Sequence, residues 1–230
     1  MRGYEKNYNM ETETHAIDTR QSPLLAIPAK VISYVFHPLF IPTYIFIFLM
    51  YQVPYEFAGI TTYQLKLRLF STFWLTAFFP AFAVFLLWRL KFSDSIFLRT
   101  QKERIVPYVI TMIFYWWMYF LSRNPKFDDQ PVVLKFFYLG IFIATVFGLI
   151  LNNYFKISLH AMAAGGAVAA ILLFALHYRM PLGAAISVTT LLAGIVCTAR
   201  FLVSDHTNKE VYAGLLVGVF CQVAAYIAVM

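Results

Sequence analysis

Three short segments of this sequence carry side chains that could do chemistry, and each lies between long apolar runs. Each segment holds at least one fixed cation, and two of them add a histidine. In chain order, the candidate residues are Arg99, Lys102 and Arg104; Lys156, Ser158 and His160; and Arg200, His206 and Glu210. Two imidazoles, a carboxylate and several cations are the groups that phosphoryl transfer through a phosphohistidine requires.

Each residue type has a distinct task in such a reaction. One imidazole attacks phosphorus, the carboxylate orients it and supports its positive charge, and the second imidazole protonates the leaving oxygen. The cations hold the equatorial phosphate oxygens. His206 and Glu210 are four residues apart, so on one helical turn they face the same way.

The composition shows what kind of scaffold positions these groups. Of the 230 residues, 61% are hydrophobic and 13% are charged, whereas a soluble protein carries about 25% charge. This excludes a disordered chain, a coiled coil and an ordinary soluble enzyme. The net charge of +7 does not indicate a nucleic-acid partner, because the basic residues form no continuous stripe between the apolar runs.

The apolar runs predict an all-α, polytopic transmembrane bundle of about seven spans, preceded by a polar N-terminal segment at residues 1–30. Each run approaches the roughly 20 residues that a helix needs to cross a bilayer, and their continuity is unlike the alternation of a transmembrane β-barrel. The first run contains His37-Pro38 and Pro42 and is the least certain to cross fully. The predicted spans are 31–52, 69–90, 106–122, 134–152, 159–176, 182–200 and 211–229.

Seven crossings would bring all three candidate segments to one side of the membrane. The segments predicted on that side are 1–30, 91–105, 153–158 and 201–210. His177 and Arg179 fall on the other side and cannot join the site. For His37 we expect a neutral imidazole bonded to a carbonyl freed by Pro38 or Pro42, and we interpret the aromatic run from Tyr115 to Tyr119 as lipid-facing bulk or an interfacial belt.

The third segment resembles a signature of the type 2 phosphatidic acid phosphatase superfamily, which reads Ser-Arg, five residues, His, three residues, Asp. Here Arg200, His206 and Glu210 have that spacing, with Ala199 in place of the serine and Glu210 in place of the aspartate. The resemblance covers residues 70–229.

The other two segments are similar to the remaining signatures of the family in a relaxed form. Residues 156–160 are similar to Pro-Ser-Gly-His, although Ile157 and Leu159 replace the Pro and Gly. Residues 102–107 are similar to the end of Lys, six residues, Arg-Pro, although Phe97 stands where the lysine is expected.

This resemblance implies a membrane phosphatase that hydrolyses a lipid phosphate or diphosphate without a metal or another cofactor. His206 would be the nucleophile, Glu210 its orienting partner and His160 the general acid. The phosphate would be bound by Lys102, Arg104, Ser158 and Arg200. Phosphatidate, phosphatidylglycerophosphate, polyprenyl diphosphate and phosphorylated lipid A all remain candidate substrates.

Two other functions remain open at this stage. A family member could bind lipid phosphate without turnover, which the departures around Ser158 favour. A secondary transporter is disfavoured, because it would place ionisable groups near mid-membrane and the spans hold almost none apart from His37. We expect a multi-pass protein of a bacterial inner membrane. The excess of Lys and Arg on the motif side favours a cytoplasmic site, whereas members of the family usually act on the external face.

Overall fold

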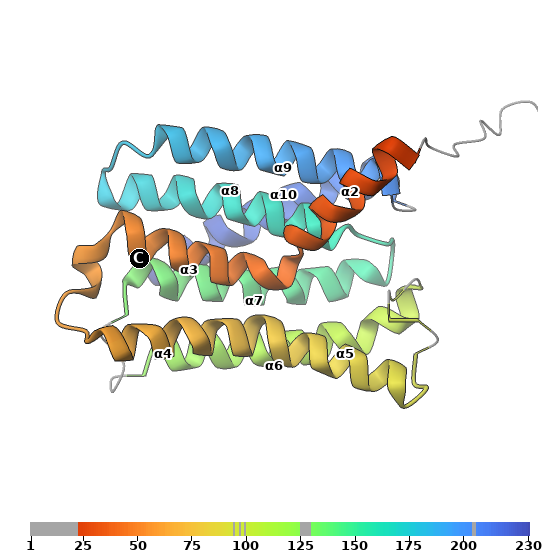
Figure 1. The fold of residues 1–230 in the computed structure, drawn as a ribbon, viewed down its shortest axis with the longest axis horizontal. Coiled ribbons are helices and arrows are strands. Elements are labelled where there is room, and N and C mark those ends of the chain that lie inside the picture. Colours follow the sequence, from red (N-terminus) through yellow and green to blue (C-terminus); the bar gives the residue numbers. More distant parts are fainter. Residues whose placement is uncertain (1–22, 94, 97, 99, 125–129, 204–205) are drawn as a thin grey trace, which may run out of the picture.

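The computed structural model is built from helices throughout the part of the chain that it describes, which is residues 23–230 without 94, 97, 99, 125–129 and 204–205. Seven helical segments among these residues are long and apolar enough to cross a membrane. The prediction of an all-α fold with seven helical segments that could span a membrane is therefore confirmed for the described residues (Figure 1).

Two of the seven segments are interrupted helices, and five are continuous. The first consists of α2 (Pro23–Val35), the 3₁₀ turn η1 (Pro38–Phe40) and α3 (Ile41–Gln52), followed by the turn η2 (Pro54–Phe57). The second consists of α4 (Thr62–Phe73), the π-helical turn η3 (Trp74–Phe78) and α5 (Phe79–Arg89). The continuous helices are α6 (Gln101–Ser122), α7 (Val132–Asn152), α8 (Leu159–Tyr178), α9 (Gly183–Val203) and α10 (Asn208–Val229).

Helices α2, α4 and α6 begin before the predicted span does, and in α4 and α6 the first turn is polar. The first apolar segment starts at Leu24, inside the range predicted as a polar terminal segment. Helix α4 starts at Thr62 and α6 at Gln101, each behind a capping box in which a threonine and the third helical residue bond reciprocally. A prediction made from apolar runs alone does not detect helix starts of this kind.

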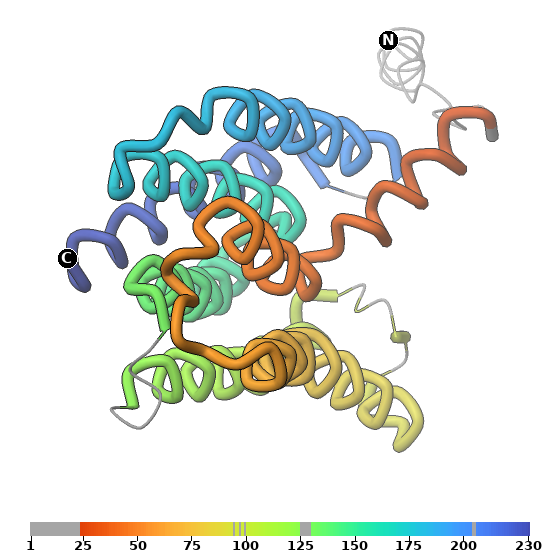
Figure 2. Tube along the Cα trace, turned by 60° about the vertical axis from the view of Figure 1, so that its left-hand side comes forward, coloured from red at the N-terminus to blue at the C-terminus, as the bar shows by residue number. Residues whose placement is uncertain are grey.

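The first segment bends where His37 precedes Pro38. A residue before proline disfavours helical backbone, so α2 ends at Val35 and its axis turns away from that of α3 (Figure 2). Two of its last carbonyls accept bonds within the turn: Phe36 N donates to Ile32 O, and His37 N donates to Tyr34 O.

Helices α8 and α10 pack closely because glycines face the opposing backbone. A Cβ atom at Gly165 would meet the Leu215 carbonyl, and one at Gly218 would meet the Met162 carbonyl. Small residues permit this approach in lipid. At its far end the core is aromatic, with buried side chains from α3, α7 and α8 in one cluster.

The aromatic run on α6 divides between two environments. Trp116 and Trp117 are about half exposed, as expected for lipid-facing residues, whereas Tyr115 and Tyr119 are buried. The exposure of the tryptophans is compatible with the lipid-facing interpretation, which is wrong for the tyrosines; Tyr115 and Tyr119, four apart on the helix, share a face that packs inside the bundle.

Candidate functional site

Five of the predicted residues lie at one end of the bundle. Arg104 is in the first turn of α6, His160 in the first turn of α8 and Arg200 in the last turn of α9; His206 lies two residues before α10, and Glu210 is in its first turn. Figure 1 shows these four helix ends together, opposite the C-terminus. We call these five residues the polar cluster.

His206 and Glu210 form a hydrogen-bonded pair. His206 Nδ1 lies 3.1 Å from Glu210 Oε2, and the same carboxylate oxygen accepts a bond of 2.9 Å from the Thr207 N–H. Thr207 is the N-cap of α10, and Glu210 is its capping-box partner. Because a carboxylate accepts, Nδ1 carries the proton, and the lone pair of the neutral ring is on Nε2.

The surroundings of His206 keep its imidazole neutral at neutral pH. Burial lowers the pKa of His206 from its ordinary value of 6.5, and the positive charges of Arg104 and Arg200 lower it further, while the hydrogen bond to Glu210 acts in the opposite direction. A neutral imidazole is the form that can attack phosphorus.

Arg104 is held by main-chain carbonyls from two segments. Its Nε donates to Leu98 O at 3.0 Å, and its Nη1 donates to Ile157 O at 3.4 Å. It interacts electrostatically with Glu210 and His206. Four residues further along α6, the buried Tyr108 hydroxyl has no hydrogen-bond partner among the described residues.

His160 and Arg200 meet on Ser33 of α2, a residue that the sequence did not single out. His160 Nε2 lies 3.0 Å from the Ser33 main-chain oxygen. Arg200 Nη1 donates to Ser33 Oγ at 3.2 Å. Arg200 also lies within electrostatic range of His160 and His206, so the two imidazoles share one cationic neighbour.

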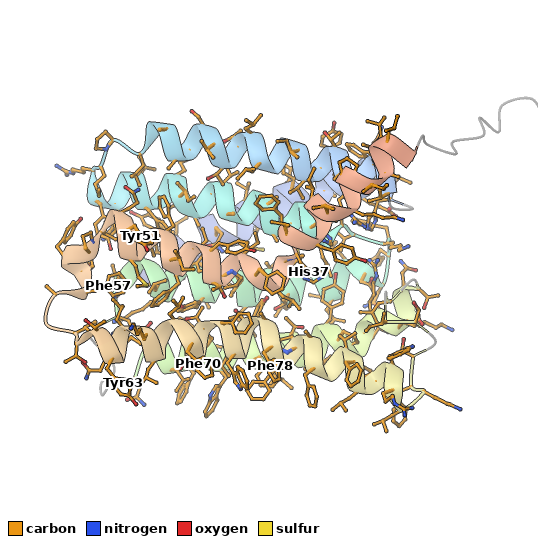
Figure 3. The ribbon with its side chains drawn as sticks, viewed as in Figure 1. His37, Tyr51, Phe57, Tyr63, Phe70 and Phe78 are labelled. Carbon is orange, nitrogen blue, oxygen red and sulfur yellow. The ribbon has the colours of Figure 1, made fainter. Side chains whose placement is uncertain are left out.

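His37 also joins this group, and its expected hydrogen bond is wrong. The ring packs edge to face against His160, with centroids 5.2 Å apart, at the junction of α2 and α3 (Figure 3). Its Nδ1 accepts from the Leu39 N–H at 3.4 Å instead of donating to a freed carbonyl. Pro38 explains the difference, because the 3₁₀ turn that it begins needs an N-cap acceptor, and His37 supplies one.

Two predicted phosphate ligands lie outside the polar cluster. Lys102 and Arg104 are two residues apart on a helix, so they point about 200° apart, and Lys102 is exposed. Ser158 is fully buried, its hydroxyl caps α8, and its N–H donates to the Glu210 main-chain oxygen at 3.2 Å. Of the four predicted phosphate ligands, Arg104 and Arg200 therefore lie in the polar cluster; Arg99, another candidate cation, lies outside the described residues.

The side chains of the His206–Glu210 pair are largely covered in this structure. Only 4% of the His206 side chain and 14% of the Glu210 side chain are exposed. Two shallow apolar hollows lie elsewhere, one between α6 and α7 and one between α3 and α4, and neither includes a residue of the polar cluster. Among the described residues, no three His, Cys, Asp or Glu side chains come together as metal ligands would.

The chain was compared with protein-family models, curated proteins and solved structures. None of the three comparisons found a significant match. The geometry of the polar cluster is therefore the basis for assigning a function.

Proposed function

We propose that the protein is a membrane phosphatase that hydrolyses a lipid phosphate or diphosphate through a phosphohistidine at His206. The observation that carries the proposal is the bond between His206 Nδ1 and Glu210, beside two arginines. This bond leaves Nε2 of a neutral imidazole as the nucleophilic atom, and the arginines supply positive charge for phosphate oxygens.

In the first chemical step, His206 Nε2 forms a bond to phosphorus while the bond from phosphorus to the lipid oxygen breaks. Arg104 and Arg200 neutralise the charge on the equatorial oxygens. The imidazole becomes positively charged, and Glu210 supports that charge through Nδ1–H. Protonated His160 gives its proton to the leaving lipid oxygen, which departs as an alcohol or, from a diphosphate, as a monophosphate.

In the second step, water attacks the phosphohistidine. His160, now neutral, accepts a proton from that water, a new oxygen–phosphorus bond forms, and the bond from phosphorus to Nε2 breaks. Inorganic phosphate leaves, and both histidines return to their starting protonation states. The cycle consumes one water and needs no other co-reactant.

The proposal includes a relationship to the type 2 phosphatidic acid phosphatases. Its support is the position of each residue on its helix: one histidine opens α8, and an arginine ending α9 is followed by a histidine that precedes α10. Helix starts at a membrane surface suit this chemistry, because a phosphorylated headgroup lies there while its tail remains among the helices.

A second candidate is a protein that binds lipid phosphate without turning it over. The observation that favours it is the cover on the His206–Glu210 pair, since only 4% of the His206 side chain is exposed and the Ser158 amide is already bonded to Glu210. Binding would need the arginines alone, whereas turnover would also need access to His206 Nε2.

One paired experiment separates the two candidates. Detergent-purified protein is tested for phosphate release from a panel of lipid phosphates and, in parallel, for binding of the same lipids. A phosphatase releases phosphate, and His206→Ala abolishes release while leaving binding measurable. His177→Ala, at the opposite end of α8, is the matched control and leaves both readouts unchanged. Binding with no release from any lipid would favour the second candidate.

A further inference from the structure

The first segment of the bundle contributes to the site through its broken end. Ser33 lies in the last turn of α2, and His37 lies two residues beyond its end. Ser33 forms hydrogen bonds with His160 and Arg200, and the His37 ring packs against the His160 ring. Nothing in the three candidate segments indicates this contact, because it joins residues 127 positions apart.

The Ser33 carbonyl can hold His160 because α2 stops. The last carbonyls of a helix lack partners within it, and His37 N donates to Tyr34 O instead of to Ser33 O. The Val35 carbonyl accepts from the Tyr44 hydroxyl at 2.9 Å. Ser33 O accepts from His160 Nε2, so each of the last carbonyls from Ile32 to Val35 has a donor.

This bond determines which nitrogen of His160 can react. A carbonyl only accepts, so Nε2 carries a proton and Nδ1 is the atom left for proton exchange. His206 has the opposite arrangement, with its proton on Nδ1 and its lone pair on Nε2. One ring is therefore prepared to attack, and the other is prepared to exchange a proton through its own unbonded nitrogen.

The hydroxyl of Ser33 is oriented toward Arg200. It donates to Ala29 O at 2.9 Å, which leaves its lone pairs for the Arg200 Nη1–H at 3.2 Å. Ser33 is buried, and its neighbours Ile32 and Phe36 pack into an apolar cluster with Ala164, Ala193 and Val196 of α8 and α9. Helix α2 is thus fixed against the two helices that carry His160 and Arg200.

We infer that Ser33 is a positioning residue of the site. Its main-chain oxygen holds His160 with Nδ1 facing the leaving oxygen, and its hydroxyl holds the Arg200 guanidinium at the same phosphate. The inference rests on the proposed function for its catalytic consequence, whereas the nitrogen that carries the His160 proton can be measured without turnover.

The activity test compares variants of Ser33 with a matched control. Ser33→Ala should raise KM for the lipid phosphate about ten-fold, as expected for loss of a hydrogen bond to a charged group, with kcat within about two-fold because Arg200 binds phosphate in ground and transition states alike. Ser33→Thr keeps the hydroxyl and should restore KM. Thr198→Ala, which removes a similar hydroxyl bond to the carbonyl four residues earlier on α9, should leave KM unchanged.

A double-mutant cycle tests whether Ser33 acts through Arg200. In an Arg200→Lys background, Ser33→Ala should add less than about a two-fold change, because partners in one contact are not additive. A ten-fold rise in KM on Ser33→Ala in the Arg200→Lys background as well as in the wild type would overturn the assignment. An unchanged or lower KM in Ser33→Ala alone would overturn it as well, because Ser33 would then restrain the arginine instead of positioning it.

A spectroscopic test distinguishes failure of this inference from failure of the proposed function. Nitrogen NMR of histidine-labelled full-length protein in detergent should find Nε2 of His160 protonated, with Nδ1 bare whenever the ring is neutral, and the same in Ser33→Ala, which keeps the carbonyl. A neutral His160 with its proton on Nδ1 and a bare Nε2 would overturn the inference even in an active enzyme. A wild type that releases no phosphate would overturn the proposed function, and the His160 signal would still decide whether Ser33 holds that ring.

Discussion

The carboxylate of Glu210 has two tasks that substitution can separate. It accepts from His206 Nδ1 at 3.1 Å, and it completes the capping box of α10 by accepting from Thr207 N at 2.9 Å. Glutamine serves equally well in a capping box, and the protein contains an example in α4, where Gln64 Oε1 accepts from Thr61 N at 2.9 Å. Glu210→Gln should therefore keep the start of α10 and remove only the charge.

The expected loss of rate follows from that single contact. A hydrogen bond between charged groups contributes about 1.5 to 3 kcal/mol, and about 1.4 kcal/mol corresponds to a ten-fold change in rate. Because the carboxylate supports positive charge that forms on His206 during attack, most of this contribution appears in the transition state. We expect Glu210→Gln to lower kcat by between about ten-fold and about one hundred-fold.

Glu210→Asp tests the reach of the side chain. The observed 3.1 Å contact uses the full length of glutamate, so an aspartate one methylene shorter leaves the contact with His206 too long while keeping the charge. Activity should fall in the order wild type, Asp, Gln. Thermal stability should follow a different order, with Gln close to wild type and Asp lower because its side chain cannot complete the capping box.

The assay is the initial rate of phosphate release together with thermal unfolding of the same detergent-solubilised samples. The reasoning would be refuted by a Gln variant as active as wild type, since Glu210 would then be a capping residue without a role in the reaction. Equal losses of stability and rate in both variants would refute it too, because the damage would then be structural.

Other predictions follow from the arginines and from the helix packing. Arg104→Ala should lower kcat/KM by about 10²-fold, whereas Lys102→Ala, exposed on another side of α6, should stay within about two-fold. Because burial lowers the pKa of His206, activity should persist below pH 6.5 and fall as pH drops through that lowered pKa. Removing the positive charge of Arg104 raises the pKa of His206. The acid limb of the pH–rate profile should therefore move to higher pH in Arg104→Ala. Gly218→Ala places a Cβ against the backbone of α8 and should cost about 1 to 3 kcal/mol of stability, while Gly194→Ala, which meets open space, should be neutral or stabilising in thermal unfolding.

The fold was largely predictable because lipid imposes a simple rule on the sequence. Each span needs an apolar run of sufficient length, and all seven runs became helical segments. The errors lie at the helix starts, where Thr61 and Thr100 begin capping boxes with polar first turns. Capping depends on a pattern of side chain and backbone bonds, which a count of apolar residues does not detect.

The site was predictable where it depends on local spacing. The four-residue interval between His206 and Glu210 predicted their pairing, and the structure has that bond. The same periodicity would have separated Lys102 from Arg104, had the start of α6 been placed at Gln101. The prediction that both cations bind the same phosphate therefore came from the error in the helix boundary.

The remainder of the site depends on packing between distant segments. Ser33 reaches Arg200 across 167 positions of sequence, through the packing of α2 on α9. Ser158 is occupied because the first turn of α10 lies against it. The one sequence signal for the contribution of the first segment was His37-Pro38, which ends α2 and frees its carbonyls, although the expected bond of His37 itself was wrong.

Trapping the covalent intermediate would show directly whether His206 is the nucleophile. Wild-type protein is mixed with a lipid phosphate labelled in its phosphoryl group, quenched within one turnover in base, where a phosphorus–nitrogen bond survives, and mapped by mass spectrometry. The account predicts one labelled site, His206, with the label retained in Ser33→Ala and lost in His206→Ala. Two results would contradict this prediction. One is phosphate release by wild-type protein that carries the label on a residue other than His206. The other is an unlabelled wild type together with a His206→Ala variant that turns over at the wild-type rate.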